Sequence, residues 1–173
     1  MNDPLTNGLN PVQSEAVDAR WAVVLTRQLR QGPARVWTAL TDPHGLAGWT
    51  PYTADRDLST PGPANLTMTD GSSGAPLDGT VLTAQPPYLL EHHWGEDVLR
   101  WELVESGGGT LLTLRHTTSR RAELASFAAG WHLCLDTLDL LLAGTPRKPV
   151  VGERARDFGW AELEARYREV LTA

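Results

Sequence analysis

One long amphipathic segment, residues 121–143, constrains the fold of this chain more than any other stretch. Gly144 and Pro146 follow it and predict where the helix ends, and Ser119 is the predicted N-cap. A helix with so continuous an apolar face must be covered by a large partner. Its apolar side chains recur at steps of three and four residues, the spacing of one helix face: Leu124, Phe127, Trp131, Leu135, Leu138 and Leu142.

The partner is predicted from residues 52–117, where short runs rich in Leu, Val, Thr and Trp alternate with turns rich in Gly and Pro. A further strand is predicted over about 20–30, followed by two short helices over about 33–40 and 42–49. Strands joined by such tight turns pair with antiparallel neighbours. We therefore expect an α+β fold in which a curved antiparallel sheet wraps around the long helix.

The length of 173 residues fits one domain. Residues 1–19 are polar and are predicted to form a flexible leader, and residues 20–144 are predicted to form the folded body. Residues 145–173 are expected to form a connector and an amphipathic helix packed on the outside of that body. The apolar residues of this last helix are Trp160, Leu163, Tyr167 and Leu171.

Composition narrows the possible partners and cofactors. A net charge of −6 without a cluster of Lys and Arg argues against nucleic acid. Cys134 is the only cysteine, so neither an intrachain disulfide nor a thiolate metal cage can form. No apolar run is long enough to span a bilayer, and the first residues lack the apolar stretch of a signal peptide. We expect a cytoplasmic protein without cofactor, metal or membrane insertion, and no oligomeric state is predicted.

A candidate site follows from the alternation of side chains along three predicted strands. If one face of each strand meets the long helix, tryptophan and histidine side chains converge beneath it in a mostly apolar hollow, the usual composition of a small-molecule site. The alternative is a filled core with hydrogen-bonded histidines. The predicted ligand-binding set is Trp49, His92, Trp94, Trp101, Leu114, His116, Phe127, Trp131 and Leu135.

His92 and His116 are the candidates for acid–base chemistry, because an imidazole titrates near neutral pH. No carboxylate or nucleophile stands at a recognisable spacing from them, so no catalytic residue is assigned. His93 points to the opposite face from His92, which argues against a shared metal ion.

Several further residues predict local features of the fold. Gly130 interrupts a good helix and indicates a close approach, for which tight helix–sheet packing is favoured over contact with a ligand. His132 and Asp136 are predicted to form a surface pair, and Cys134 a quiet buried thiol. Residues 107–109 are expected to form a hairpin turn.

Four pieces of the sequence together resemble one family. Residues 36–43, with the sequence VWTALTDP, continue to Leu46 and Trp49 and resemble the helix-pair signature of the START-like, or SRPBCC, superfamily. Within it, the likeness is to the branch of the activator of heat-shock-protein-90 ATPase C-terminal domain. Residues 87–90 with Trp94, residues 100–103 with 109–116, and residues 130–138 resemble later parts of that branch, so the similarity spans about 20–144.

The resemblance implies a helix-grip cavity that in relatives binds lipids, polyketides or other apolar molecules, sometimes with cyclase or dehydratase chemistry. We therefore expect a carrier or sensor of a small apolar ligand. A polyketide-cyclase-like enzyme using a cavity histidine and a co-chaperone-type interaction module are the alternatives. The eukaryotic co-chaperone has an additional N-terminal domain, whereas this chain is expected to have only a short leader, so a chaperone partner is not favoured.

Overall fold

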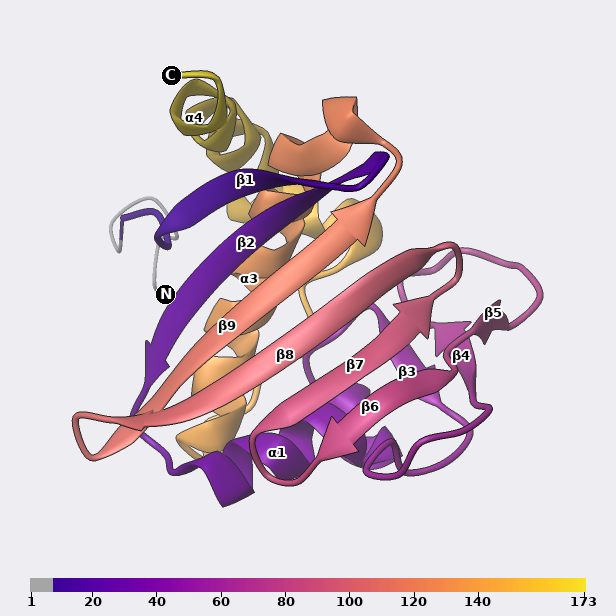
Figure 1. The fold of residues 1–173 in the computed structure, drawn as a ribbon. Coiled ribbons are helices and arrows are strands. Elements are labelled where there is room, and N and C mark those ends of the chain that lie inside the picture. Colours follow the sequence, from indigo (N-terminus) through magenta and orange to yellow (C-terminus); the bar gives the residue numbers. More distant parts are fainter. Residues whose placement is uncertain (1–7) are drawn as a thin grey trace.

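The computed structural model describes residues 8–173 and is built around a curved antiparallel sheet with strand order β1-β2-β9-β8-β7-β6 (Figure 1). A small second sheet has the order β3-β4-β5. The strands of the main sheet are β1 (Val12–Val17), β2 (Arg20–Leu29), β6 (Val81–Gln85), β7 (Leu89–Trp94), β8 (Asp97–Ser106) and β9 (Gly109–Thr118). Those of the second are β3 (Tyr52–Ala54), β4 (Asn65–Met68) and β5 (Leu77–Asp78).

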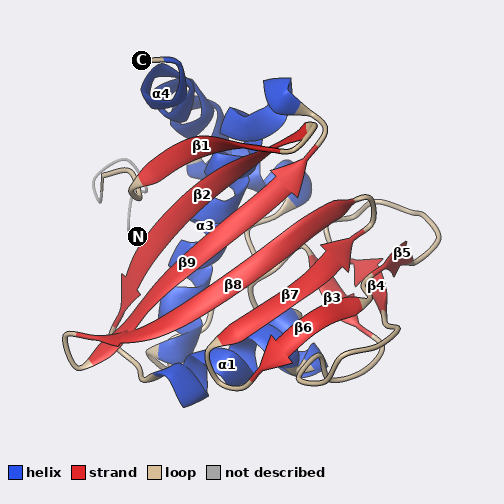
Figure 2. Ribbon diagram, viewed as in Figure 1, coloured by secondary structure: helices blue, strands red, loops and turns tan. Residues whose placement is uncertain are grey.

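The helices gather on one side of the main sheet, as Figure 2 shows. The long helix α3 crosses the sheet, and a helix α4 lies beside it near the chain end (Figure 1). This arrangement confirms the predicted helix-grip fold of class α+β. The helices are α1 (Pro33–Thr41), α2 (Pro43–Leu46), α3 (Leu124–Leu142) and α4 (Trp160–Thr172), with 3₁₀ helices η1 (Arg121–Glu123) and η2 (Gly152–Phe158).

The two short helices follow the proline signals in the sequence. Pro33 stands in the first turn of α1, where its missing N–H costs nothing. The carboxylate of Asp42 accepts a hydrogen bond of 2.9 Å from the backbone N–H of Gly45, which confirms it as the N-cap of α2. Helix α2 ends at Leu46, three residues before the predicted end.

The hairpin of β8 and β9 turns at Gly107 and Gly108, as predicted. Both have φ in the left-handed region, at 57° and 79°, which a two-residue hairpin turn of this kind requires. Gly109 follows, and a Cβ atom there would lie 2.0 Å from the carbonyl oxygen of Leu29. The close pairing of β9 with β2 therefore depends on glycine at this position.

Part of the predicted leader is a strand. Residues 12–17 form β1, which pairs with β2 through the two-residue turn at Asp18 and Ala19. Asp18 has φ of 54°, a conformation that Asp tolerates better than most residues. The strand was missed because most of its side chains are exposed or half-buried and show no apolar alternation. Residues 1–7 of the predicted leader lie outside the described residues.

Helix α3 begins differently from the prediction. The turn η1 precedes it, and Glu123 rather than Ser119 occupies the N-cap position, without a side-chain hydrogen bond. The far end agrees with the sequence signal, because Gly144 adopts φ of 81° directly after the helix. Between these ends α3 is buried on more than one side, since the sheet covers one face and α4 packs on another.

The predicted pair on α3 forms, with His132 Nε2 3.5 Å from Asp136 Oδ2, but it does not lie on the surface, because α4 covers His132. His132 is 0% exposed, and its Nδ1 atom accepts a hydrogen bond of 2.7 Å from the hydroxyl of Tyr167 on α4. The same hydroxyl accepts a hydrogen bond of 3.0 Å from the backbone N–H of Asn10. Asp136, one turn further along, pairs with Arg27 of β2 at 2.8 Å. This polar cluster ties the N-terminal segment, α3 and α4 together.

We expect Tyr167→Phe to lower the free energy of unfolding by about 1–3 kcal/mol, because it leaves the buried Asn10 N–H without its partner and removes the shorter of the two hydrogen bonds to His132 Nδ1. Urea unfolding followed by circular dichroism measures this loss. Tyr88→Phe is the matched control, since the Tyr88 side chain is 49% exposed. Equal stabilities of the two variants would contradict a structural role for the cluster.

Candidate ligand-binding site

The three central strands present the faces that their alternation predicted. On the side that faces α3, the strands β7, β8 and β9 bury the side chains at every second position, and each side chain named below is at most 1% exposed. These side chains are Leu90, His92, Leu99, Trp101, Leu103, Leu112, Leu114 and His116.

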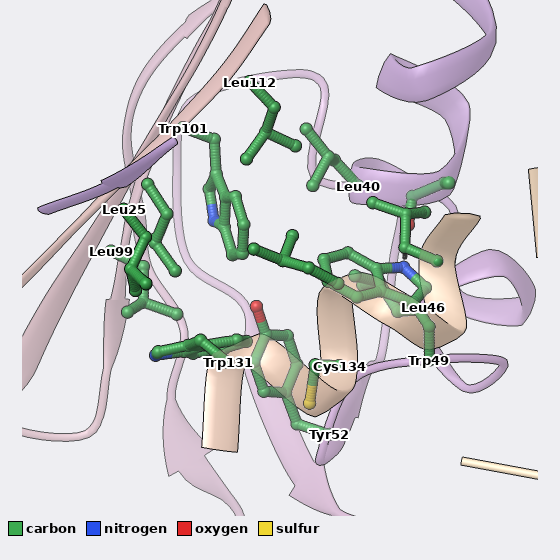
Figure 3. Close-up of a cluster of buried hydrophobic side chains, with 14 of the residues drawn as sticks. Leu25, Leu40, Leu46, Trp49, Tyr52, Leu99, Trp101, Leu112, Trp131 and Cys134 are labelled. Atoms are coloured by element: carbon green, nitrogen blue, oxygen red, sulfur yellow. Dashed lines mark hydrogen bonds between the residues drawn. The ribbon is translucent and has the colours of Figure 1, made fainter. Parts of the chain in front are cut away.

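The space between the sheet and the middle of α3 is filled by aromatic rings. Trp131 of α3 meets Trp101 of β8 edge to face, with ring centroids 5.4 Å apart, and Trp49 meets the other side of Trp101 at 5.6 Å. Figure 3 shows Trp101 and Trp131 packed among leucine side chains. Trp49, Leu114 and Leu135 are fully buried in the same cluster. These members of the predicted ligand-binding set lie in a filled core.

Each buried histidine accepts a hydrogen bond from a tryptophan. The Trp101 indole N–H donates to His92 Nε2 at 3.3 Å, and the Trp131 indole N–H donates to His116 Nδ1 at 3.0 Å. The remaining nitrogen of His92 donates to the carbonyl of His93 at 2.9 Å, and that of His116 donates to Asp97 Oδ2 at 2.8 Å. Tryptophan can only donate, so these contacts fix the tautomer of each ring. Neither imidazole has a free nitrogen for a substrate.

Burial keeps both imidazoles neutral. It lowers the pKa of His92 from 6.5 to about 4, although the hydrogen bond to His93 acts in the opposite direction. Burial also lowers the pKa of His116, and the neighbouring carboxylate of Asp97 only partly offsets this. A neutral ring is the form that can accept the tryptophan N–H.

Asp97 links the core to the surface. Burial alone would raise the pKa of Asp97, but hydrogen bonds from His116, Thr118 and Arg120 lower it below its usual value. Arg120 lies 2.9 Å from this carboxylate and also stacks over the ring of Phe127 at 5.0 Å. The charge of Asp97 is thus compensated, and its two oxygens orient the groups around it rather than facing an open space.

A pocket of about 310 Å³ opens beside this core rather than within it. Its inner wall contains three members of the predicted set, namely Trp94, Phe127 and Trp131. Its outer wall comes from the segment after α3. Pro51 and further residues of α3 complete the lining of the pocket. The outer-wall residues are Val150, Val151, Gly152, Ala155, Arg156 and Trp160.

Gly130 lies on the wall of this pocket, which corrects the preferred expectation of tight helix–sheet packing. A Cβ atom at this position would meet nothing within 4 Å, so the glycine borders open space. Ser126 and Cys134, one turn to either side, line the same pocket. The missing side chain at Gly130 therefore contributes to the depth of the pocket, and it was the signal in the sequence that pointed here.

The remaining reactive groups near the pocket are neutral and buried. Cys134 is 3% exposed and burial raises the pKa of its thiol to about 12, which confirms the quiet thiol that the sequence predicted. Burial also raises the pKa of Tyr52, whose hydroxyl points toward Trp101 and Trp131 in Figure 3. Neither group offers a nucleophile at neutral pH.

Within residues 8–173, no group of three or more His, Cys, Asp or Glu side chains is arranged to hold a metal ion. Among the same residues, no helix is long and apolar enough to cross a membrane.

The fold and the matched residues define the class of protein. Residues 31–143 match the family described as Activator of Hsp90 ATPase homolog 1-like protein. The chain belongs to this family, in agreement with the resemblance found in its sequence. The match ends before the outer wall of the pocket, which residues 150–160 provide. A search of curated proteins gives no match.

Solved structures share the fold over most of the chain. CalU16 from Micromonospora echinospora has a TM-score of 0.69 at 21% identity, covering 95% of this chain and 98% of that one. EF2215 from Enterococcus faecalis, a conserved protein of unknown function, has a TM-score of 0.71 at 16% identity and covers 94% and 90%. DynU16, from the dynemicin biosynthetic locus, has a TM-score of 0.62 at 22% identity and covers 74% and 50%.

The buried His92 predicts a pH dependence of stability. Its pKa is lowered by folding, so its contribution is complete above about pH 6.5 and is lost as the pH falls toward about 4. Within that window one proton taken up on unfolding changes the free energy of unfolding by about 1.4 kcal/mol per pH unit. We expect His92→Gln to reduce the slope of stability against pH by about this amount, measured by urea unfolding between pH 6 and 5.

The exposed His44 supplies the control, since His44→Gln also removes one imidazole. An unchanged slope in His92→Gln would show that burial does not hold His92 neutral.

Proposed function

We propose that this protein binds a small, flat, largely apolar molecule in the pocket between α3 and residues 150–160, as a carrier or sensor. The observation that carries the proposal is an open pocket whose walls hold the aromatic rings of Trp94, Phe127, Trp131 and Trp160. Its volume of about 310 Å³ lies at the lower end of the range for small-molecule sites. Aromatic walls favour a flat ligand, because offset stacking adds to the gain from apolar burial.

The inner wall is rigid, which suits selective binding. Trp131 is held by its hydrogen bond to His116 and by edge contacts with Trp94 and Trp101 at 5.5 and 5.4 Å. A ligand that packs on this ring therefore loses little further side-chain entropy from the wall. The expected site is pre-formed along its inner side, while the segment 150–160 forms the other side.

The enzyme alternative has less support from the geometry. His92 and His116 line no part of this pocket, and all four of their ring nitrogens are engaged with Trp101, Trp131, the His93 carbonyl and Asp97. Binding without turnover is therefore the favoured function. The description of DynU16 as a protein of a biosynthetic locus supports a small organic molecule as the ligand.

Gly130 allows a direct test of the pocket. We expect Gly130→Phe to weaken binding of the neutral probe 2-naphthamide by roughly tenfold or more, because its ring would fill the space that the glycine leaves open. Isothermal titration calorimetry measures the dissociation constant. Native mass spectrometry of the freshly purified protein tests in parallel for a bound compound that is lost on denaturation.

Gly130→Ala is the matched control, because its single methyl group meets nothing within 4 Å. It should keep most of the affinity and raise the free energy of unfolding by up to about 1 kcal/mol, since alanine favours the helix. The proposal would be contradicted if 2-naphthamide does not bind and no compound is carried through purification. Equal binding by the wild type and Gly130→Phe would place the site elsewhere.

A further inference from the structure

We propose that the ligand of this pocket is an amphipathic monoanion, with its flat apolar body against the tryptophans and a carboxylate or similar group held by Arg156. This inference rests on the proposed function and adds the chemical class of the ligand. The chain carries a net charge of −6, so an anionic ligand requires a local cation to overcome the general repulsion.

Arg156 is that cation. It lies in η2, on the outer wall of the pocket, and within the described residues it is the only charged side chain among those that line the pocket. No carboxylate shares the lining with it. The pocket therefore offers apolar contact over most of its surface and a single positive charge at one place.

Among residues 8–173, Arg156 also has no carboxylate partner that would neutralise it. In the part of the chain that the structure describes, no ion pair joins it to a carboxylate, although Glu153 and Asp157 are close in sequence. Its guanidinium is thus available to a ligand. Six other arginines do pair with carboxylates, namely Arg20, Arg27, Arg100, Arg115, Arg120 and Arg168.

One carboxylate that contacts the lining is already compensated. Ser126, which lines the pocket, donates its hydroxyl proton to Glu164 Oε1 at 2.7 Å. Arg168 donates to the same oxygen at 2.6 Å. The carboxylate of Glu164 is therefore held in an ion pair on α4 and does not offset the positive charge of Arg156.

The position of Arg156 favours a monoanion at the pocket mouth. Its side chain is exposed, so a carboxylate bound there keeps part of its hydration and avoids the cost of burying a charge. The planar fork of a guanidinium matches the two oxygens of a carboxylate. A single arginine balances one negative charge, which argues against a doubly charged phosphate group.

A pair of probes of nearly the same shape tests the charge alone. We expect 2-naphthoate to bind the wild type about fivefold more tightly than 2-naphthamide, in calorimetric titrations at low ionic strength. Arg156→Gln should remove this preference while keeping the affinity for 2-naphthamide, which also shows that the variant pocket is intact. High salt should reduce the preference in the wild type, because the arginine is exposed.

Arg30→Gln is the control for net charge, since Arg30 is also exposed and does not line the pocket. It should keep the preference for 2-naphthoate. Equal binding of the two probes by the wild type, or a preference that survives in Arg156→Gln, would overturn the assignment of an anion and leave the proposed function standing. If neither probe binds and no compound is carried through purification, the proposed function itself falls.

Discussion

The contact of Trp131 with the inner face of the sheet organises both the core and the pocket. On one side its ring meets the edges of Trp94 and Trp101, and its N–H is donated to His116 at 3.0 Å. On another side the same ring is a wall of the pocket. A single side chain of α3 therefore helps to set how the helix sits on the sheet and what shape the pocket has.

The histidines in this core act as acceptors for indole N–H groups. Two tryptophans buried in an apolar interior would each leave a donor without a partner, at a cost of about 1–3 kcal/mol. His92 and His116 remove that cost and in turn use their second nitrogen on the His93 carbonyl and on Asp97. The two histidines looked suited to proton transfer, but their presence is explained by the hydrogen-bond acceptor that each buried indole N–H needs.

The sequence predicted the parts of the fold that depend on local periodicity. Alternation identified the inward side chains of β7, β8 and β9, and the steps of three and four residues identified α3 and α4. Local periodicity could not predict the burial of His132, because α4, which covers this residue, comes from a distant part of the chain. The outer wall of the pocket was missed for a related reason, since residues 150–156 have no helical or strand period before they pack.

The two walls of the pocket have separate origins in the sequence. The inner wall lies within residues 31–143, the stretch that defines the family, where Trp94 and Trp131 also hold the core together. Most of the outer wall lies beyond that stretch, in residues 150–160. Under the proposed function, substitutions in the outer segment change ligand preference at little cost to the core, whereas changes to the inner tryptophans also affect folding. Stability and ligand choice are then set by separate stretches of one chain, so that one can change without the other.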